Sequence, residues 1–180
     1  MFTFAAPNDI KEIVAGCLFA VRWSVESEHE LDEMAELLSD AEYLYEYFER
    51  HEERLSYFHV SVDEAVIKTA READQLIQEL NELANNSSNF EKPDLDGLFE
   101  PLHKPEAYGN SRYKFDYKAK GEKNTAPWVR IYAVRCDENF YVITGFGIKL
   151  VRQMKEDPLL ETELNKLEGA TNYLKEKGMI

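Results

Sequence analysis

The chain has 180 residues, with 21 Lys and Arg against 35 Asp and Glu, a formal net charge of −14 and a sequence pI near 4.7. Hydrophobic residues make up 44% of it and aromatic residues 12%, which excludes an intrinsically disordered chain despite the charge. Eight Gly and six Pro are few for a turn-dense β-sandwich, so we expect a single domain over residues 1–180 that contains long helices.

The two cysteines, Cys17 and Cys136, allow at most one disulfide and have no metal-binding spacing. They indicate free thiols in a reducing compartment, and we therefore predict a cytoplasmic protein. The apolar run at residues 13–21 is far shorter than the roughly 20 residues that a membrane-spanning helix needs. It also lacks a basic flank and a cleavage site, so we interpret it as a buried strand.

Charge is unevenly distributed along the chain. Residues 1–100 carry 7 basic and 24 acidic side chains, whereas residues 101–155 carry 11 basic and 5 acidic ones. Screening at physiological salt confines the field of each block to about 10 Å. The basic block can therefore attract a polyanion although the whole chain is acidic.

In the N-terminal half, residues 13–23 are predicted to form the first strand. From Ser27 onward the apolar residues recur at helical spacing, and Ser27 with Glu30 has the pattern of a capping box. Ser39 with Glu42 offers a second possible helix start. This region is expected to form the first of two long acidic helices.

A second capping box, Ser61 with Glu64, predicts the next helix, which ends at a polar linker over residues 85–89. Residues 1–90 are thus expected to hold the first strand and an acidic, antiparallel helical hairpin.

After the linker the apolar period becomes two, which is typical of strands. Asp157-Pro158 then predicts a helix start with Pro at the first helical position. Residues 91–180 are therefore expected to hold a basic sheet and a C-terminal helix. The order β-α-α-β-β-β-β-α predicts an α+β fold with a mainly antiparallel sheet. The four strand candidates of this half are residues 98–103, 111–120, 128–135 and 140–149.

The sequence lacks the motifs of the common metal, phosphate-binding and nucleophile sites of enzymes. The four histidines show no ligand spacing, so no metal is expected. No glycine-rich phosphate loop lies between a strand and a helix, and no combination of Ser, Cys and His indicates a nucleophile. We accordingly expect no cofactor.

Basic side chains alternate with aromatic ones along the predicted sheet. Such a face suits RNA, because cations hold phosphates while rings stack on bases. It could also cleave RNA without metal, since Lys, Arg and Tyr can supply the base, the cation and the acid of in-line attack by a 2′-hydroxyl. Composition alone leaves open an ordinary solvated face. The residues of this face are Arg112, Lys114, Lys118, Lys120, Arg130, Tyr132, Lys149 and Arg152.

The segment from about residue 98 to 177 resembles the RelE/HigB superfamily of bacterial toxins, which are ribosome-dependent mRNA interferases. The resemblance lies in the order of four features, and it extends to residues 1–90 by element order only. These features are the basic strand Arg112-Tyr113-Lys114-Phe115, the central strand Trp128-Val129-Arg130-Ile131-Tyr132-Ala133-Val134, the strand and corner from Phe140 to Lys149, and the helix start Asp157-Pro158.

The resemblance implies roles for single residues. Lys114 matches a lysine in a strand of the family, which is proposed to transfer a proton or to stabilise the phosphate. Arg130 matches the arginine that stabilises the transition-state phosphate. Lys149 matches the second basic residue of the corner motif. These three are the predicted catalytic residues. The predicted RNA-binding residues are Arg112, Lys118, Lys120, Tyr132 and Arg152.

Three departures from the family pattern weaken the case for catalysis more than the case for the fold. Asp116 stands where many relatives have a second basic residue, and Ile148 replaces the first lysine of the corner. The end of the chain, residues 178–180, lacks the terminal tyrosine or basic tail of some members.

Two functions are therefore open. The first is a RelE/HigB-like endoribonuclease that inhibits translation, with the ribosome, mRNA and a neutralising antitoxin as partners. The second is a non-catalytic interaction protein on the same fold, whose basic sheet face binds an acidic protein partner. Because the acidic residues 1–100 would repel RNA, an RNA-binding face must point away from them.

Overall fold

A computed structural model describes residues 6–86, 94–104, 106, 109 and 111–180, except for the side chains of residues 111 and 112. It is an α+β fold with a six-stranded sheet in the order β1-β2-β6-β5-β4-β3. Neighbouring strands are antiparallel except for β2 and β6, which are parallel. The strands are β1 (Asp9–Val14), β2 (Leu18–Arg22), β3 (Glu100–Pro101), β4 (Asp116–Ala119), β5 (Val129–Asp137) and β6 (Phe140–Ile148).

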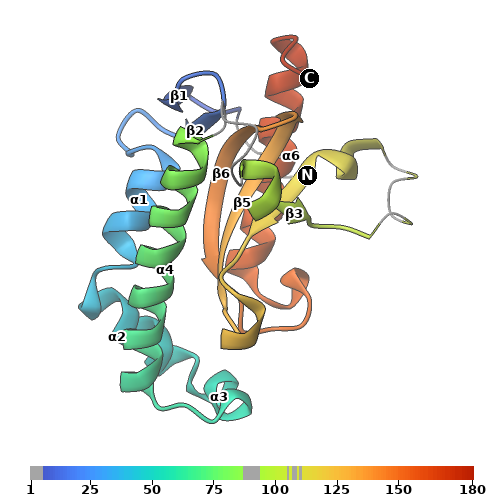
Figure 1. The fold of residues 1–180 in the computed structure, drawn as a ribbon. Helices are drawn as coiled ribbons and strands as arrows, with labels where there is room; N and C mark the ends of the chain where they lie inside the picture. The colour runs from blue at the N-terminus through green and yellow to red at the C-terminus, as the bar shows by residue number, and fades with distance from the viewer. Residues whose placement is uncertain (1–5, 87–93, 105, 107–108, 110) are drawn as a thin grey trace.

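Helices cover both faces of this sheet (Figure 1). The helices α1, α2 and α4 lie on one face, and α6 crosses the other. The helices of the described residues are α1 (Glu30–Leu37), α2 (Ala41–Arg50), α3 (Glu52–Leu55), α4 (Val62–Asn85), α5 (Leu95–Leu98) and α6 (Pro158–Glu176), with short 3-10 turns η1 (Ser56–Phe58), η3 (Ser111–Phe115), η4 (Lys123–Thr125) and η5 (Met154–Glu156).

The central strand β5 is buried on both sides because its residues alternate between two cores. Ile131 and Ala133 belong to the core beneath α1, α2 and α4, whereas Tyr132 and Val134 belong to the core beneath α6. Antiparallel pairing of β5 with β6, predicted from the sequence, is confirmed.

The single strand predicted over residues 13–23 is wrong, because a hairpin occupies this region. β1 and β2 are joined by a tight turn in which Gly16 has φ +74°, a conformation that favours glycine. The apolar residues of β2 are buried between β1 and β6, as the sequence indicated for a core strand.

The first predicted helix is divided into α1 and α2, and its predicted capping box does not form. The Ser27 hydroxyl is hydrogen-bonded to Ser24 instead, and His29 precedes α1 without a side-chain cap. Asp40, rather than Ser39, caps α2 by accepting from the backbone N–H groups of residues 42 and 43.

Two other helix starts agree with the sequence. Ser61 and Glu64 form the predicted capping box of α4. Asp157 caps α6, with Pro158 at its first turn. The buried Asp157 carboxylate also accepts from Arg54 Nη1 at 2.6 Å, which ties the α3 region to the start of α6.

The strand predicted over residues 111–120 forms only in part. Residues 111–115 make the 3-10 turn η3, and β4 begins at Asp116. Because of this turn, Phe115 packs into the core beneath α6. Strict alternation along a strand would have placed it on the opposite side of the sheet.

A buried charge cluster joins α6 to α1. Lys166 Nζ lies 3.2 Å from both Glu30 Oε1 and Glu163 Oε1. A side chain at Gly145 would collide with Glu163 Oε2, so glycine is required at this close approach. Burial, with the nearby Glu30 charge, raises the pKa of Glu163 to about 8, although Lys166 opposes this shift.

We predict that this cluster makes stability fall as pH rises. The raised pKa means that folded Glu163 holds a proton which the unfolded chain has lost above about pH 4.5. Its contribution is fully present near pH 4 and is lost as pH rises to about 8. The slope is at most about 1.4 kcal/mol per pH unit.

Urea unfolding of wild type and Glu163→Gln between pH 5 and 8 measures this effect. The variant should lose the Glu163 part of the slope, whereas Glu161→Gln, on the exposed side of α6, should keep the wild-type slope. Equal slopes for all three proteins would contradict the assignment.

Candidate functional site

The pairing register gathers basic residues on one face of the sheet. Residues directly opposite each other in neighbouring strands share a face, and Lys118 of β4 pairs with Tyr132 of β5. Two residues along β5, Arg130 lies on that same face and pairs with Gly147 of β6. This is the face that α6 covers.

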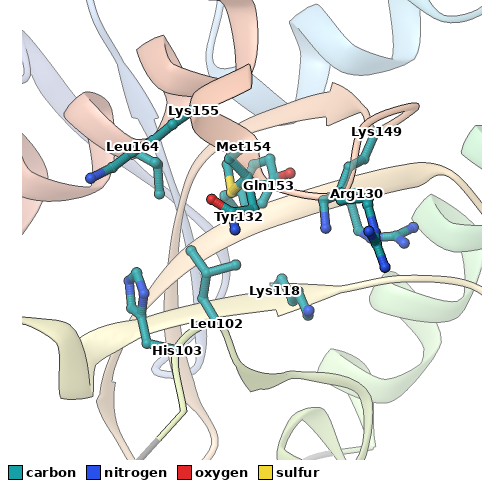
Figure 2. A pocket seen from close by; sticks show the side chains of 11 residues that line it. Leu102, His103, Lys118, Arg130, Tyr132, Lys149, Gln153, Met154, Lys155 and Leu164 are labelled. Atoms are coloured by element: carbon teal, nitrogen blue, oxygen red, sulfur yellow. The ribbon is translucent and has the colours of Figure 1, made fainter. Parts of the chain in front are cut away.

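Helix α6 covers only part of this face, because it begins at Pro158 and the chain reaches it through η5. The end of the sheet beside η5 is therefore hollow, with a pocket of about 340 Å³ (Figure 2). We call it the cationic pocket. Its lining residues are Leu102, His103, Lys118, Arg130, Tyr132, Lys149, Arg152, Gln153, Met154, Lys155 and Leu164.

Helix α4 fixes the start of β5, where Arg130 lies. The Glu72 carboxylate accepts from the backbone N–H groups of Trp128 and Val129 at 3.1 and 3.0 Å. The Trp128 indole donates to Thr69 Oγ1 at 2.8 Å. These contacts hold the strand from the opposite face of the sheet, so the position of Arg130 does not depend on a ligand.

The Arg130 guanidinium is only partly satisfied by the protein. Its Nη1 donates to the carbonyl oxygens of Pro127 and Val129 at 2.8 and 3.1 Å. Its Nε is buried and has no hydrogen-bond partner among the described residues, and the same holds for the Tyr132 hydroxyl. Unsatisfied buried donors are costly, so a ligand that accepted from them would be stabilised.

Burial and repulsion between neighbouring cations lower the pKa values of Lys118 and Lys149. Burial, together with the neighbouring charges of Lys120, Lys149 and Arg130, lowers the pKa of Lys118, although Glu100 opposes the shift. Burial, Arg130 and Lys120 likewise lower the pKa of Lys149. An anion in the pocket would reverse both effects.

No carboxylate lines the cationic pocket in the part of the chain that the structure describes. Two carboxylates outside the lining act on its lysines: Glu100, whose carboxylate lies 3.8 Å from Lys118, and Glu156, whose charge acts on Lys149. Glu100 is half exposed, and such a pair contributes little. Five Lys and Arg side chains thus surround a cavity without a lining carboxylate.

The acidic N-terminal helices lie on the other face of the sheet (Figure 1). The helices α1, α2 and α4 thus point away from the basic face of the sheet. Their negative charge is separated from the cationic pocket by the sheet, and screening at physiological salt reduces it further.

The structure brings together most, but not all, of the predicted site residues. Lys114 lies outside the cationic pocket, exposed, with its ammonium over the Phe115 ring at 5.0 Å. Lys120 does not line the pocket but influences it by charge. Arg112 lies in η3, and its side chain is outside the described residues. The predicted residues that line the pocket are Lys118, Arg130, Tyr132, Lys149 and Arg152.

Sequence reasoning missed His103 as a site residue. Its Nε2 lies 2.7 Å from Oδ2 of the buried Asp116, and its ring packs on that of Tyr113. The sequence held a usable signal, because His103 and Asp116 belong to two predicted strands that are consecutive in the chain. Pairing those strands as an antiparallel hairpin would have brought the two residues together.

No family model, no curated protein and no solved structure matches this chain. None of the described helices is both long enough and apolar enough to cross a bilayer. Among the described residues, no group of three or more His, Cys, Asp and Glu side chains could hold a metal ion.

We predict that the cationic pocket binds inorganic pyrophosphate in the wild-type protein. Arg130→Gln and Lys149→Gln should each weaken binding at least about tenfold, since each removes a charge-assisted hydrogen bond to the anion. Isothermal titration calorimetry would measure this, with Arg71→Gln, on the exposed side of α4, as the control.

The same titration, repeated at alkaline pH in buffers of different ionisation enthalpy, should detect proton uptake. Binding raises the lowered pKa values of Lys118 and Lys149, so protons are taken from the buffer. Equal affinities for Arg130→Gln and Arg71→Gln would rule the pocket out as the anion site.

Proposed function

We propose that this protein is a RelE/HigB-like toxin, a metal-independent endoribonuclease that cuts mRNA at the ribosome and is neutralised by an antitoxin. The observation that carries the proposal is the cationic pocket, with five Lys and Arg side chains and no lining carboxylate among the described residues. Such a site favours phosphate groups over neutral or cationic ligands.

The arrangement of elements supports a RelE-like topology. Apart from the additional strand β1 and the additional short helices, the order of strand β2, the helical region, the strands β3 to β6 and the final helix α6 is the order that the resemblance implies. Most of the resemblance rests on two motifs, one in β5 and one in β6 with the corner that follows it. These two strands lie side by side. Arg130 and Lys149 of these motifs reach the same pocket.

The reaction proposed is in-line attack of a ribose 2′-hydroxyl on the adjacent phosphate. It requires stabilisation of the charge that develops on the phosphorane, and Arg130 is suited to this role because its guanidinium remains protonated. It also requires an acid for the leaving 5′-oxygen. Lys149 and Lys118 fit this role, because both line the same pocket as Arg130 and an ammonium group can donate a proton to the leaving oxygen.

Lys114, proposed as catalytic from the resemblance, remains a prediction. Its place outside the cationic pocket leads us to assign Lys118 and Lys149 ahead of it. RNA could still pass over Lys114, whose ammonium is exposed beside the neighbouring η3 turn.

Expression in a bacterial host tests the function directly. Induction of the wild-type chain should arrest growth and create new mRNA ends within translated codons. Arg130→Ala should abolish both effects, because it removes the cation that stabilises the phosphorane. Arg71→Ala should leave both unchanged.

Growth curves and mapping of transcript 5′ ends are the measurements. Normal growth and intact transcripts, with the wild-type chain soluble at the level of its variants, would exclude the nuclease. The non-catalytic alternative would then be favoured, and a pull-down with Arg130→Ala as the matched bait would identify the acidic partner.

A further inference from the structure

The proposed nuclease needs a base, and the cations of the pocket are poorly suited to that role. A lysine or arginine can accept a proton only after it has lost its own. A phosphate bound beside these side chains favours their protonated forms. The group that takes the proton of the 2′-hydroxyl must therefore come from another part of the pocket wall.

His103 is the one histidine among the lining residues of the cationic pocket, and imidazole is the side chain that serves most often as a general base. Asp116 holds it from behind, with Oδ2 at 2.7 Å from Nε2 and a carboxylate that is 4% exposed. Tyr113 packs on the imidazole at a centroid distance of 4.4 Å. The ring is therefore fixed on two sides.

This hydrogen bond bears on which nitrogen is available. Where Asp116 accepts the bond as a carboxylate, Nε2 carries the proton and donates it. The lone pair of the neutral ring is then on Nδ1, which has no hydrogen-bond partner among the described residues. A carboxylate that orients an imidazole in this way also stabilises the imidazolium formed when the ring takes a proton.

The position of His103 suits in-line displacement. Figure 2 shows His103 at one side of the pocket and Arg130 with Lys149 at the other, with Lys118 between them. Attacking and leaving oxygens occupy opposite apices of the phosphorane, so the base and the acid must come from opposite sides. The imidazole of His103 and the ammonium of Lys149 lie on opposite sides of the pocket (Figure 2).

We infer that His103 is the general base of this site and that Asp116 is the positioning residue that holds it, an inference that rests on the proposed nuclease function. Nδ1 takes the proton of the 2′-hydroxyl as the 2′-oxygen bonds to phosphorus. The bond from phosphorus to the 5′-oxygen breaks, and that oxygen takes a proton from Lys149 or Lys118. The products are a 2′,3′-cyclic phosphate and a free 5′-hydroxyl, and water then restores both protonation states.

Asp116 gains a function from this inference. At the sequence level it counted against catalysis, because it stands where relatives have a basic residue. In the structure it shares the α6 face of β4 with Lys118, and among the described residues its side chain is hydrogen-bonded to His103 alone.

Cleavage of mRNA on purified ribosomes, measured together with RNA affinity, tests the inference. His103→Ala should lower the cleavage rate at least about 100-fold, the usual effect of losing a general base. Its affinity for a 2′-O-methyl RNA, which cannot be cleaved, should stay within twofold of wild type. Added imidazole should restore part of the rate, which loss of a merely structural contact would not allow.

Two comparisons complete the design. His59→Asn, at a surface residue with φ +54° where Asn is tolerated, should cleave like wild type, whereas His103→Asn should not. Adding Asp116→Asn to His103→Ala should reduce the imidazole rescue, because the added ring would no longer be oriented.

The outcomes separate this inference from the proposed function. If His103→Ala cleaves at the wild-type rate while Arg130→Ala does not, the nuclease stands and His103 is not its base. A loss of cleavage that imidazole does not restore would also overturn the assignment. If the wild-type chain does not cleave mRNA, both the proposed nuclease function and the assignment of His103 as its base are refuted.

Discussion

The cationic pocket depends on one constraint, the point at which α6 begins. Pro158 cannot continue a helix backwards, and Asp157, held by Arg54, caps the first turn. The sheet face beyond this point is left without a covering helix. Residues at the covered end of this face are apolar or small, whereas those at the open end are Lys and Arg. The site is thus a part of the sheet face that the fold leaves open.

The strand register then determines which charges meet there. Because paired residues share a face, Lys118 and Arg130 face the pocket while Ile131 and Ala119 pack beneath the helices on the other side. A shift of the β4–β5 pairing by one residue would exchange these sets and bury the lysine in an apolar core. The buried hydrophobic residues of β5 therefore hold the cations in place, and stability and site geometry depend on the same pairing.

The parts of this fold that could be predicted from the sequence are those specified by local patterns. The β5–β6 hairpin, the capping box at Ser61 and the Pro158 helix start were predicted and are confirmed, because alternation and capping act over a few residues. The hairpin turn at Gly16 and the 3-10 turn before Asp116 were missed, since each depends on how the flanking segments pack. The pairing of His103 with Asp116 was missed for a similar reason. It follows only when the two predicted strands are paired as an antiparallel hairpin, a step that the pattern within each strand does not supply.

A crystal structure of the protein with a 2′-O-methyl RNA dinucleotide would test the central claim most directly. The account predicts a phosphate group in the cationic pocket, within hydrogen-bond distance of Arg130 and of Lys118 or Lys149, with the 2′-oxygen facing His103 Nδ1. A phosphate bound elsewhere on the chain, with the pocket free of RNA, would contradict it.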